Sequence, residues 1–240
     1  MNKLLPLLLL CVALPARADL TGDFRQNVTA ANLKPFALDL GGVLGAASVD
    51  PGRRLGFPHV EAGIVSGIQF RPDRDDAILR NSGVKTFGVP MLHASVGLPF
   101  GFDVVAHGLS YAGAKVFGAG ARWTAFKVPM TDGSLPMIGV GAFADRVTHS
   151  DFEASHYGLN GSLGWSLPLI APFVNAGLDV THATVRAATA AGTVGATAWA
   201  RGSRFGGGVD LTPFPFTRIR AAYEIIHGAP GATLDFLLKF

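Results

Sequence analysis

The chain has 240 residues and a formal net charge of +3; 49% of the residues are hydrophobic and only 15% are charged. The cations form neither a basic run nor a basic helix, which excludes a nucleic-acid partner. Cys11 is the only cysteine, so no disulfide within the chain can staple the fold. Past Leu20, no window approaches the ~18 unbroken apolar residues of a membrane helix, which excludes a helical membrane protein.

Residues 1–18 have the pattern of a secretory signal peptide. Lys3 supplies the basic region, Leu4 to Leu14 the apolar region, and Ala16-Arg17-Ala18 the small-residue cleavage site. The apolar region is too short for a membrane anchor, which needs ~20 residues. Leu10 precedes Cys11 where a lipoprotein site requires a small residue. The sequence therefore predicts an exported chain that begins at residue 19.

One or two short helices are expected within residues 19–57, before any strand. Apolar residues recur there at helical spacing, and the "DPG" turn ends the run. Gly41, Gly42 and Gly45 each lower intrinsic helix stability by up to ~1 kcal/mol. Tertiary contacts must therefore hold this helix in place.

From residue 58 onward the apolar residues recur with a period of two. In "FVNAGLDVT", Val174, Ala176 and Leu178 alternate with Asn175 and Gly177. Successive side chains of a strand point to opposite faces, so each segment has one apolar face and one polar or glycine face. Turn sequences separate about ten predicted strands, at 58–70, 85–98, 101–110, 113–127, 135–148, 152–167, 170–183, 196–211, 215–227 and 230–240.

Three features favour a membrane barrel over a soluble β-sandwich. The predicted strands are longer than the ~5–6 residues usual in a sandwich and suit tilted spans of a bilayer. Their polar face combines glycines with Arg, Asp, His and Asn, as a filled or wet lumen would. Aromatic residues lie near strand ends, where interface girdles form. We therefore predict a closed antiparallel transmembrane β-barrel of about ten strands over 58–240, in a Gram-negative outer membrane.

The connections indicate which end of this barrel faces outward. The two longest, "RPDRDDAILRNSGV" and "ATVRAATAAGTVG", follow odd-numbered strands, and long loops are usual on the outer side. The helix within 19–57 then has one core to join, the lumen. We expect a lumen plug or a cap at the periplasmic mouth, with a helix lying loosely outside the barrel as the alternative. The expected plug residues are Leu33, Phe36, Leu40, Val43 and Leu44.

The chain ends on the alternating sequence "LDFLLKF". A lipid-facing side and pairing with the first strand explain why no polar tail follows. The pattern of Leu234, Phe236, Leu238 and Phe240 resembles the signal that delivers outer-membrane barrels to their assembly machinery. That resemblance implies the barrel assembly machinery as a partner, beside outer-membrane lipid and lipopolysaccharide.

The N-terminal region carries a second resemblance. A helical prelude with an "LKPF" and glycine pattern, followed by "GF" before the first strand, resembles a bacterial outer-membrane barrel family of unassigned function; here these are Leu33 to Phe36 and Gly56-Phe57. The architecture is loosely similar to the long-chain fatty-acid and hydrocarbon transporters, which have an N-terminal plug. Those transporters have larger barrels than this chain can form. The likeness implies passage of a small solute, hydrophobic solutes included.

Polar residues of inward parity are the main functional candidates. Their mixed charges either fill the barrel with salt bridges, since buried charges must pair, or line a narrow polar path. We expect a narrow passive channel, transporter or binding barrel for a small solute, with a structural or anchoring barrel of closed lumen as the alternative. The lumen set comprises Glu61, Gln69, His93, Asp103, His107, Arg122, Asp145, His156, Asn160, Asn175, Asp179, Arg204, Asp210, Arg218, Arg220, Glu224, Asp235 and Lys239.

An outer-membrane hydrolase is the second alternative. In "HASVG", His93 and Ser95 share one face, a spacing similar to that of lipid A deacylases, where an imidazole can activate the hydroxyl. His149, Asp151 and His182 fall at the predicted outer rim, where omptin-like proteases hold their Asp and His pairs. His93 and Ser95 face the lumen near the periplasmic end, away from lipid at the cell surface. Rim loops collect polar residues in any case, so we expect no enzyme.

We expect neither a cofactor nor a metal site. The loop that contains Asp73, Asp75 and Asp76 offers oxygen ligands but lacks the glycine and distal Glu of a calcium-binding hand. The histidines have no metal-ligand spacing. A solvated acidic loop, bridged by cations to lipopolysaccharide phosphates, is the expected role of this segment.

Overall fold

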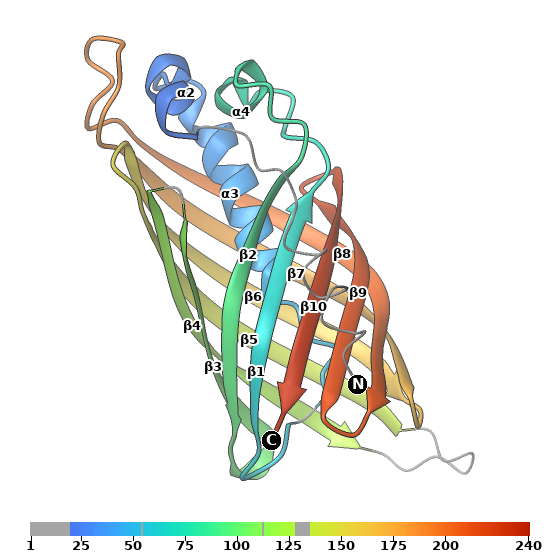
Figure 1. Ribbon diagram of the computed structural model, residues 1–240. Coiled ribbons are helices and arrows are strands. Elements are labelled where there is room, and N and C mark those ends of the chain that lie inside the picture. The colour runs from blue at the N-terminus through green and yellow to red at the C-terminus, as the bar shows by residue number, and fades with distance from the viewer. Residues whose placement is uncertain (1–19, 54, 112, 128–134) are drawn as a thin grey trace, which may run out of the picture.

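Ten antiparallel strands close into one barrel in the computed structural model (Figure 1). The structure describes residues 20–53, 55–111, 113–127 and 135–240, so the predicted signal peptide lies outside it. Each strand pairs with the next along the chain, and β1 pairs with β10 to complete the circle. The predicted ten-stranded closed barrel is confirmed. Its strands are β1 (Val60–Gln69), β2 (Phe87–Gly97), β3 (Phe102–Tyr111), β4 (Ala114–Lys127), β5 (Leu135–Thr148), β6 (Phe152–Ser166), β7 (Ile170–Val185), β8 (Thr197–Phe214), β9 (Thr217–Ile226) and β10 (Ala229–Lys239).

The barrel wall is apolar outside and polar inside, the reverse of a soluble protein. Along β2, buried and exposed residues alternate without exception. On β7 the outward Val174 and Leu178 are 52% and 59% exposed, whereas the inward Asn175 and Asp179 are buried. Each strand pairs with a neighbour on both sides, so the closed sheet has no free edge strand, as a bilayer requires of a spanning sheet. The fold is therefore a transmembrane β-barrel.

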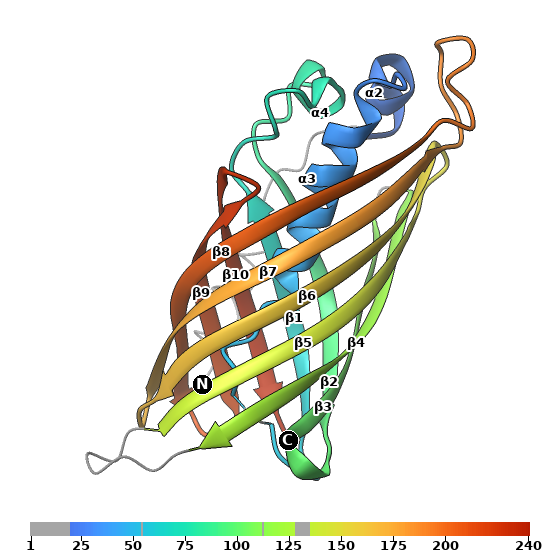
Figure 2. The ribbon, with the colours of Figure 1, turned by 180° about the vertical axis from the view of Figure 1, so that it is seen from behind.

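The N-terminal segment lies inside the barrel. α2 (Leu20–Asn27) sits at one mouth, and α3 (Leu33–Ala47) descends from it between the strands (Figures 1 and 2). The chain then reaches the opposite end, where Gly56 packs against Gly97 of β2. None of the described helices is long and apolar enough to span a membrane. Of the expected arrangements, a lumen plug or a mouth cap with a helix outside the barrel as the alternative, the structure has α3 buried within the barrel, as in a plug.

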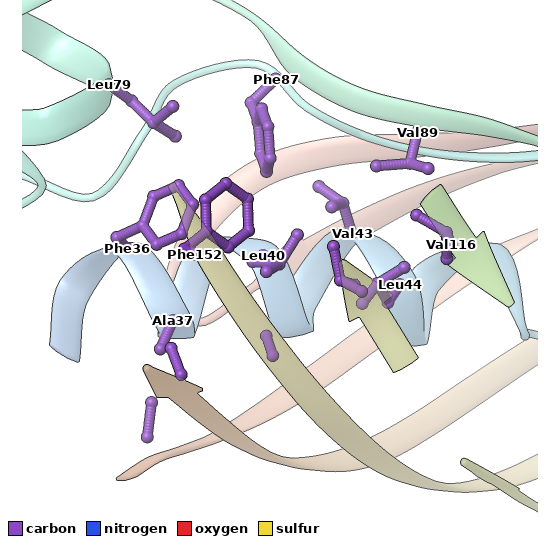
Figure 3. Close-up of a cluster of buried hydrophobic side chains, with 14 of the residues drawn as sticks. Phe36, Ala37, Leu40, Val43, Leu44, Leu79, Phe87, Val89, Val116 and Phe152 are labelled. Atoms are coloured by element: carbon purple, nitrogen blue, oxygen red, sulfur yellow. The ribbon is translucent and has the colours of Figure 1, made fainter. Parts of the chain in front are cut away.

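Apolar packing holds the upper part of the plug. Phe36 of α3 lies 5.1 Å, between ring centroids, from both Phe24 of α2 and Phe152 of β6. Deeper in the lumen, Leu44 belongs to the same buried cluster as Val116 of β4 (Figure 3). These contacts are the barrel's hydrophobic core, and they supply the stabilisation that the glycine-rich helix lacks on its own. All the expected plug residues are buried: Leu33, Phe36, Leu40, Val43 and Leu44.

The two ends of the barrel carry different connections. One, the long-loop end, holds α2, the β7–β8 loop and the β1–β2 loop (Figure 1). The β1–β2 loop contains α4 (Ala77–Asn81), and the Asp76 carboxylate caps it by accepting from Leu79 N at 3.0 Å. The other, the short-turn end, has turns at 167–169 and 215–216. The β4–β5 connection at 128–134 lies outside the described residues.

Candidate functional site: the filled lumen

The structure gathers the sequence-predicted polar residues in the lumen. Seventeen of them are buried, and Lys239 is half-buried. They come from all ten strands and meet the N-terminal segment rather than open water. The buried set is Glu61, Gln69, His93, Asp103, His107, Arg122, Asp145, His156, Asn160, Asn175, Asp179, Arg204, Asp210, Arg218, Arg220, Glu224 and Asp235.

Asp50, which follows α3, is fixed by three arginines of the barrel wall. Its Oδ2 atom lies 3.1 Å from Arg220 Nη2 and 3.5 Å from Arg218 Nη2, both on β9. Arg122 of β4 binds the same oxygen through Nη1. Arg220 also donates to the Val49 carbonyl of the plug. Sequence reasoning read this segment only as a helix stop; a lone carboxylate between two glycine-rich stretches gave no signal of three distant partners.

The same arginines are balanced by carboxylates of the wall. Arg218 binds Glu61 at 3.1 Å and also Asp210, while Arg220 binds Asp235 at 2.8 Å. Buried charges are tolerated only when paired in this way, because a lone charge loses its hydration. The lower lumen is thus a network of ion pairs with the plug's carboxylate at its centre.

A chain of alternating histidines and carboxylates crosses the upper lumen. Asp145 of β5 bonds His107 through one oxygen and His156 Nδ1 through the other, the latter at 2.6 Å. His156 Nε2 continues to Asp179 Oδ1 at 3.0 Å, and Arg204 Nη2 donates to the same oxygen at 3.1 Å. Every link lies inside the barrel, so the chain ties β3, β5, β6, β7 and β8 together around the plug.

The glycine face of α3 rests on this chain. A Cβ on Gly41 would lie 2.0 Å from Thr181 Oγ1, and one on Gly45 would lie 2.2 Å from Asp179 Oδ1. The wall has its own close approach at Gly67, whose added Cβ would lie 2.0 Å from the Val43 carbonyl oxygen. Glycine is therefore required where helix backbone meets the wall. The three glycines that weaken α3 as an isolated helix are the ones that let it enter the lumen.

Little space remains around the plug. Two cavities inside the lumen have volumes of about 10 Å³ each. A space of that size holds about one water molecule. His93 and Arg122 line the first of them, and both ring nitrogens of His93 are buried without a hydrogen-bond partner. A trapped water is the natural partner for such atoms.

Among the residues proposed for hydrolase chemistry, His149 and Asp151 lie together at the rim, with His149 Nδ1 3.9 Å from Asp151 Oδ2. His93 and Ser95 are buried, and neither the His93 ring nor Ser95 Oγ has a hydrogen-bond partner in the described structure. At the rim, Asp151 is bound by Arg25 of α2. His182 instead packs on the Trp199 ring, 4.5 Å away between centroids.

The acidic loop and the C-terminal pattern take up separate places. Asp73 accepts from Asp75 N at 2.9 Å, while Asp76 caps α4. Within the described ranges, no group of three or more His, Cys, Asp or Glu side chains could hold a metal ion. Leu234 of β10 and Phe240, the residue after that strand, are exposed, on the same parity as the partly exposed Phe236 and the exposed Leu238.

Comparison with known proteins gives likeness of fold only. No family model matches this chain, and no curated protein matches it in sequence. A de novo designed transmembrane β-barrel is similar with 10% identity over 80% of this chain and 98% of that chain, at a TM-score of 0.34. Neisserial surface protein A shows 11% identity over 75% and 94% of the two chains, at a TM-score of 0.30. The assignment of the barrel rests on the strand pairing of this chain itself.

A third similar structure is larger than this chain. It is a loop-deletion variant of OmpT, an outer membrane protein of Vibrio cholerae, with 12% identity and a TM-score of 0.31. The match covers 64% of this chain and 54% of that one, so this chain spans about half of its length.

Proposed function

We propose that this chain is an outer-membrane β-barrel whose lumen is held closed by its own N-terminal segment. The barrel serves as a membrane anchor that presents its long-loop end at the cell surface. The observation that carries this proposal is the position of Asp50 between Arg122, Arg218 and Arg220. A plug bound by a buried charge to two opposite parts of the wall does not leave by thermal motion alone. The lumen is therefore closed in its resting state.

The location follows from the surface and the termini. The outer wall exposes aliphatic and aromatic side chains at mid-strand, including Leu159 and Leu178. Such a surface is stable only in lipid. The signal-peptide pattern and the terminal Phe240 support export and assembly in an outer membrane, as in the resemblance drawn from the sequence.

Gated passage of a small solute is the second candidate, and one observation favours it. Besides His93, the side-chain atoms Arg122 Nε and Arg220 Nε are buried without hydrogen-bond partners. An interior that served only as filler would gain stability from apolar residues there. If residues 48–57 moved aside, these atoms would line a polar path of the kind that sets selectivity in narrow channels.

Ion conductance in planar bilayers separates the two candidates. The full-length protein, Asp50→Asn, and Asp75→Asn as a control on the exposed loop are reconstituted at equal density. Heat-modifiable migration in detergent gels verifies folding of each. A steady current through the wild-type protein would overturn the closed lumen. Openings in Asp50→Asn but not in Asp75→Asn would favour the gated channel, whereas silence in all three supports the anchor.

A further inference from the structure

Three exposed cations on the described strands of the outer wall lie on neighbouring parts of the barrel, near its long-loop end. Lys115 on β4, Arg146 on β5 and Arg201 on β8 are exposed on the wall, and Arg186 follows β7 at the rim. The outward residues of β9, β10, β1, β2 and β3 include no Lys or Arg among those that the structure describes. A general girdle would surround the barrel, whereas this set is local.

Two of these arginines, Arg146 and Arg186, are held in place by one carboxylate. Arg146 Nη2 lies 2.6 Å from Glu153 Oε2, and Arg186 Nη2 contacts the same oxygen. Arg146 Nη1 donates to Ser155 Oγ at 2.8 Å. Glu153 therefore sets two guanidinium groups side by side but balances only one of them. The wall keeps an excess of positive charge facing the membrane interface.

Strand register fixes the spacing within this patch. Arg146 pairs with Ser155 of β6, Ser155 with His182 of β7, and His182 with Trp199 of β8. Arg201 is the next outward residue along β8. With strands ~4.8 Å apart and a rise of ~3.4 Å per residue, Arg146 and Arg201 stand ~14 Å apart across the strands and ~7 Å along them. Two cationic points thus flank the His182 and Trp199 rings, which are in contact.

We infer that this patch binds a membrane lipid of the outer leaflet that carries two phosphate groups, the chemistry of lipid A. Lys and Arg bind phosphate through charge-assisted hydrogen bonds. The apolar wall below the patch receives the acyl chains, and aromatic rings suit the headgroup level between them. The patch faces lipid rather than water, which selects a lipid-borne phosphate. The inference rests on the membrane location in the proposed function but not on the closed lumen, so the two fail separately.

A binding titration in detergent micelles tests this site with fluorescent bis-phosphorylated lipid A as the probe. The wall variant is Lys115→Gln/Arg146→Gln/Arg201→Gln, and the matched control is Arg71→Gln/Arg74→Gln/Arg80→Gln on the solvent-exposed β1–β2 loop. Each cation near a charged lipid surface contributes about fivefold, so the wall variant should bind ~100-fold more weakly. The control should stay within about threefold. Equal losses in both variants would overturn the inference.

Two further arms distinguish a built site from general charge attraction. Glu153→Gln removes the carboxylate that competes for Arg146 and Arg186, so this variant should bind the probe about fivefold more tightly than the wild type. Weaker binding would mean that the patch has only a structural role. Lipid A without phosphates and singly charged phosphatidylglycerol should each bind at least ~10-fold more weakly than the probe. Equal binding of either lipid would also overturn the inference.

Discussion

Gly45 of α3 lies directly against Asp179 of β7, so closely that a Cβ on Gly45 would stand 2.2 Å from the Asp179 Oδ1 atom. The same carboxylate binds His156 and Arg204 of the lumen wall. The backbone of the plug and the polar network of the wall therefore share one packed contact. Any side chain added at Gly45 must push either the helix or the network out of place.

Gly45→Ala should loosen the plug. Overpacking of a tight contact costs ~1–3 kcal/mol, so the free energy of unfolding in urea should fall by about that amount, and limited proteolysis should cut residues 20–57 faster. Gly161→Ala is the matched control, because a Cβ there meets nothing within 4 Å. Equal changes in both variants would contradict a plug that is packed against the wall.

Asp50→Asn should destabilise the fold by ~3 kcal/mol, the lower end of the cost of breaking a buried ion pair. The lower end is expected because Arg218 and Arg220 keep the carboxylates of Asp210 and Asp235. Reversible unfolding in urea measures the change. Asp75→Asn, on the exposed loop, should remain within ~0.5 kcal/mol of the wild type. An unchanged free energy of unfolding in Asp50→Asn would mean that the pairing of Asp50 with the arginines does not stabilise the fold.

Charge on the outer wall should be tolerated according to depth. Leu178→Arg, in the middle of β7, should cost ~2–4 kcal/mol in reversible folding into bilayers. Thr184→Arg has the same outward parity near the end of that strand and should cost only ~0–1 kcal/mol. Similar costs at both positions would mean that this wall faces water rather than lipid. A larger cost at Thr184 than at Leu178 would mean that Thr184, not Leu178, lies nearer the middle of the membrane.

Acid should tighten the contact between α3 and the β1–β2 loop. Burial raises the pKa of Asp39 to about 8, and the nearby Asp76 carboxylate adds to the rise. Burial also raises the pKa of Asp76 to about 6. Between the unfolded value of ~3.9 and these values, the folded chain holds more protons than the unfolded chain, so the free energy of unfolding falls as the pH rises. Urea unfolding at pH 5 and pH 8 measures the slope.

Asp39→Asn is the variant that checks this assignment. Its amide no longer titrates, but its single oxygen can accept from only one of the two donors that the carboxylate has now, Gln69 Nε2 and Asp73 N, so the overall stability should fall as well. The loss of stability between pH 5 and pH 8 should shrink in this variant. An unchanged slope would assign the pH dependence to other groups.

Cysteine labelling of whole cells should show which end faces outward. Ala191→Cys, in the β7–β8 loop, should react with a membrane-impermeant maleimide, whereas Pro168→Cys, in a short turn, should react only after lysis. Both positions are exposed. The wild-type protein should not react at all, since signal-peptide cleavage would remove Cys11. Labelling of Pro168→Cys on intact cells would mean that the short-turn end, not the long-loop end, faces outward.

Local chemistry determined the wall of this protein. Alternation of the kind seen at Val174, Asn175, Ala176 and Gly177 sets which face each side chain joins, and turn sequences end the segments. The ten strands and the inward parity of the lumen set could therefore be read from the sequence. One boundary shows the limit: β8 continues past its predicted end to Phe214, because a register shift after Leu211 lets the strand pass Pro213.

Only the tertiary structure decided how the lumen is filled. Helical spacing predicted α3, but not that it enters at the long-loop end or that residues near Gly56 reach the far mouth. Asp50 meets Arg122 and Arg220 across 72 and 170 positions of the chain, and no local pattern encodes such contacts. The outward cations were visible in the sequence as scattered residues; strand register brought them to one side. Period and composition fix the faces of a barrel, whereas its closure fixes which distant residues meet.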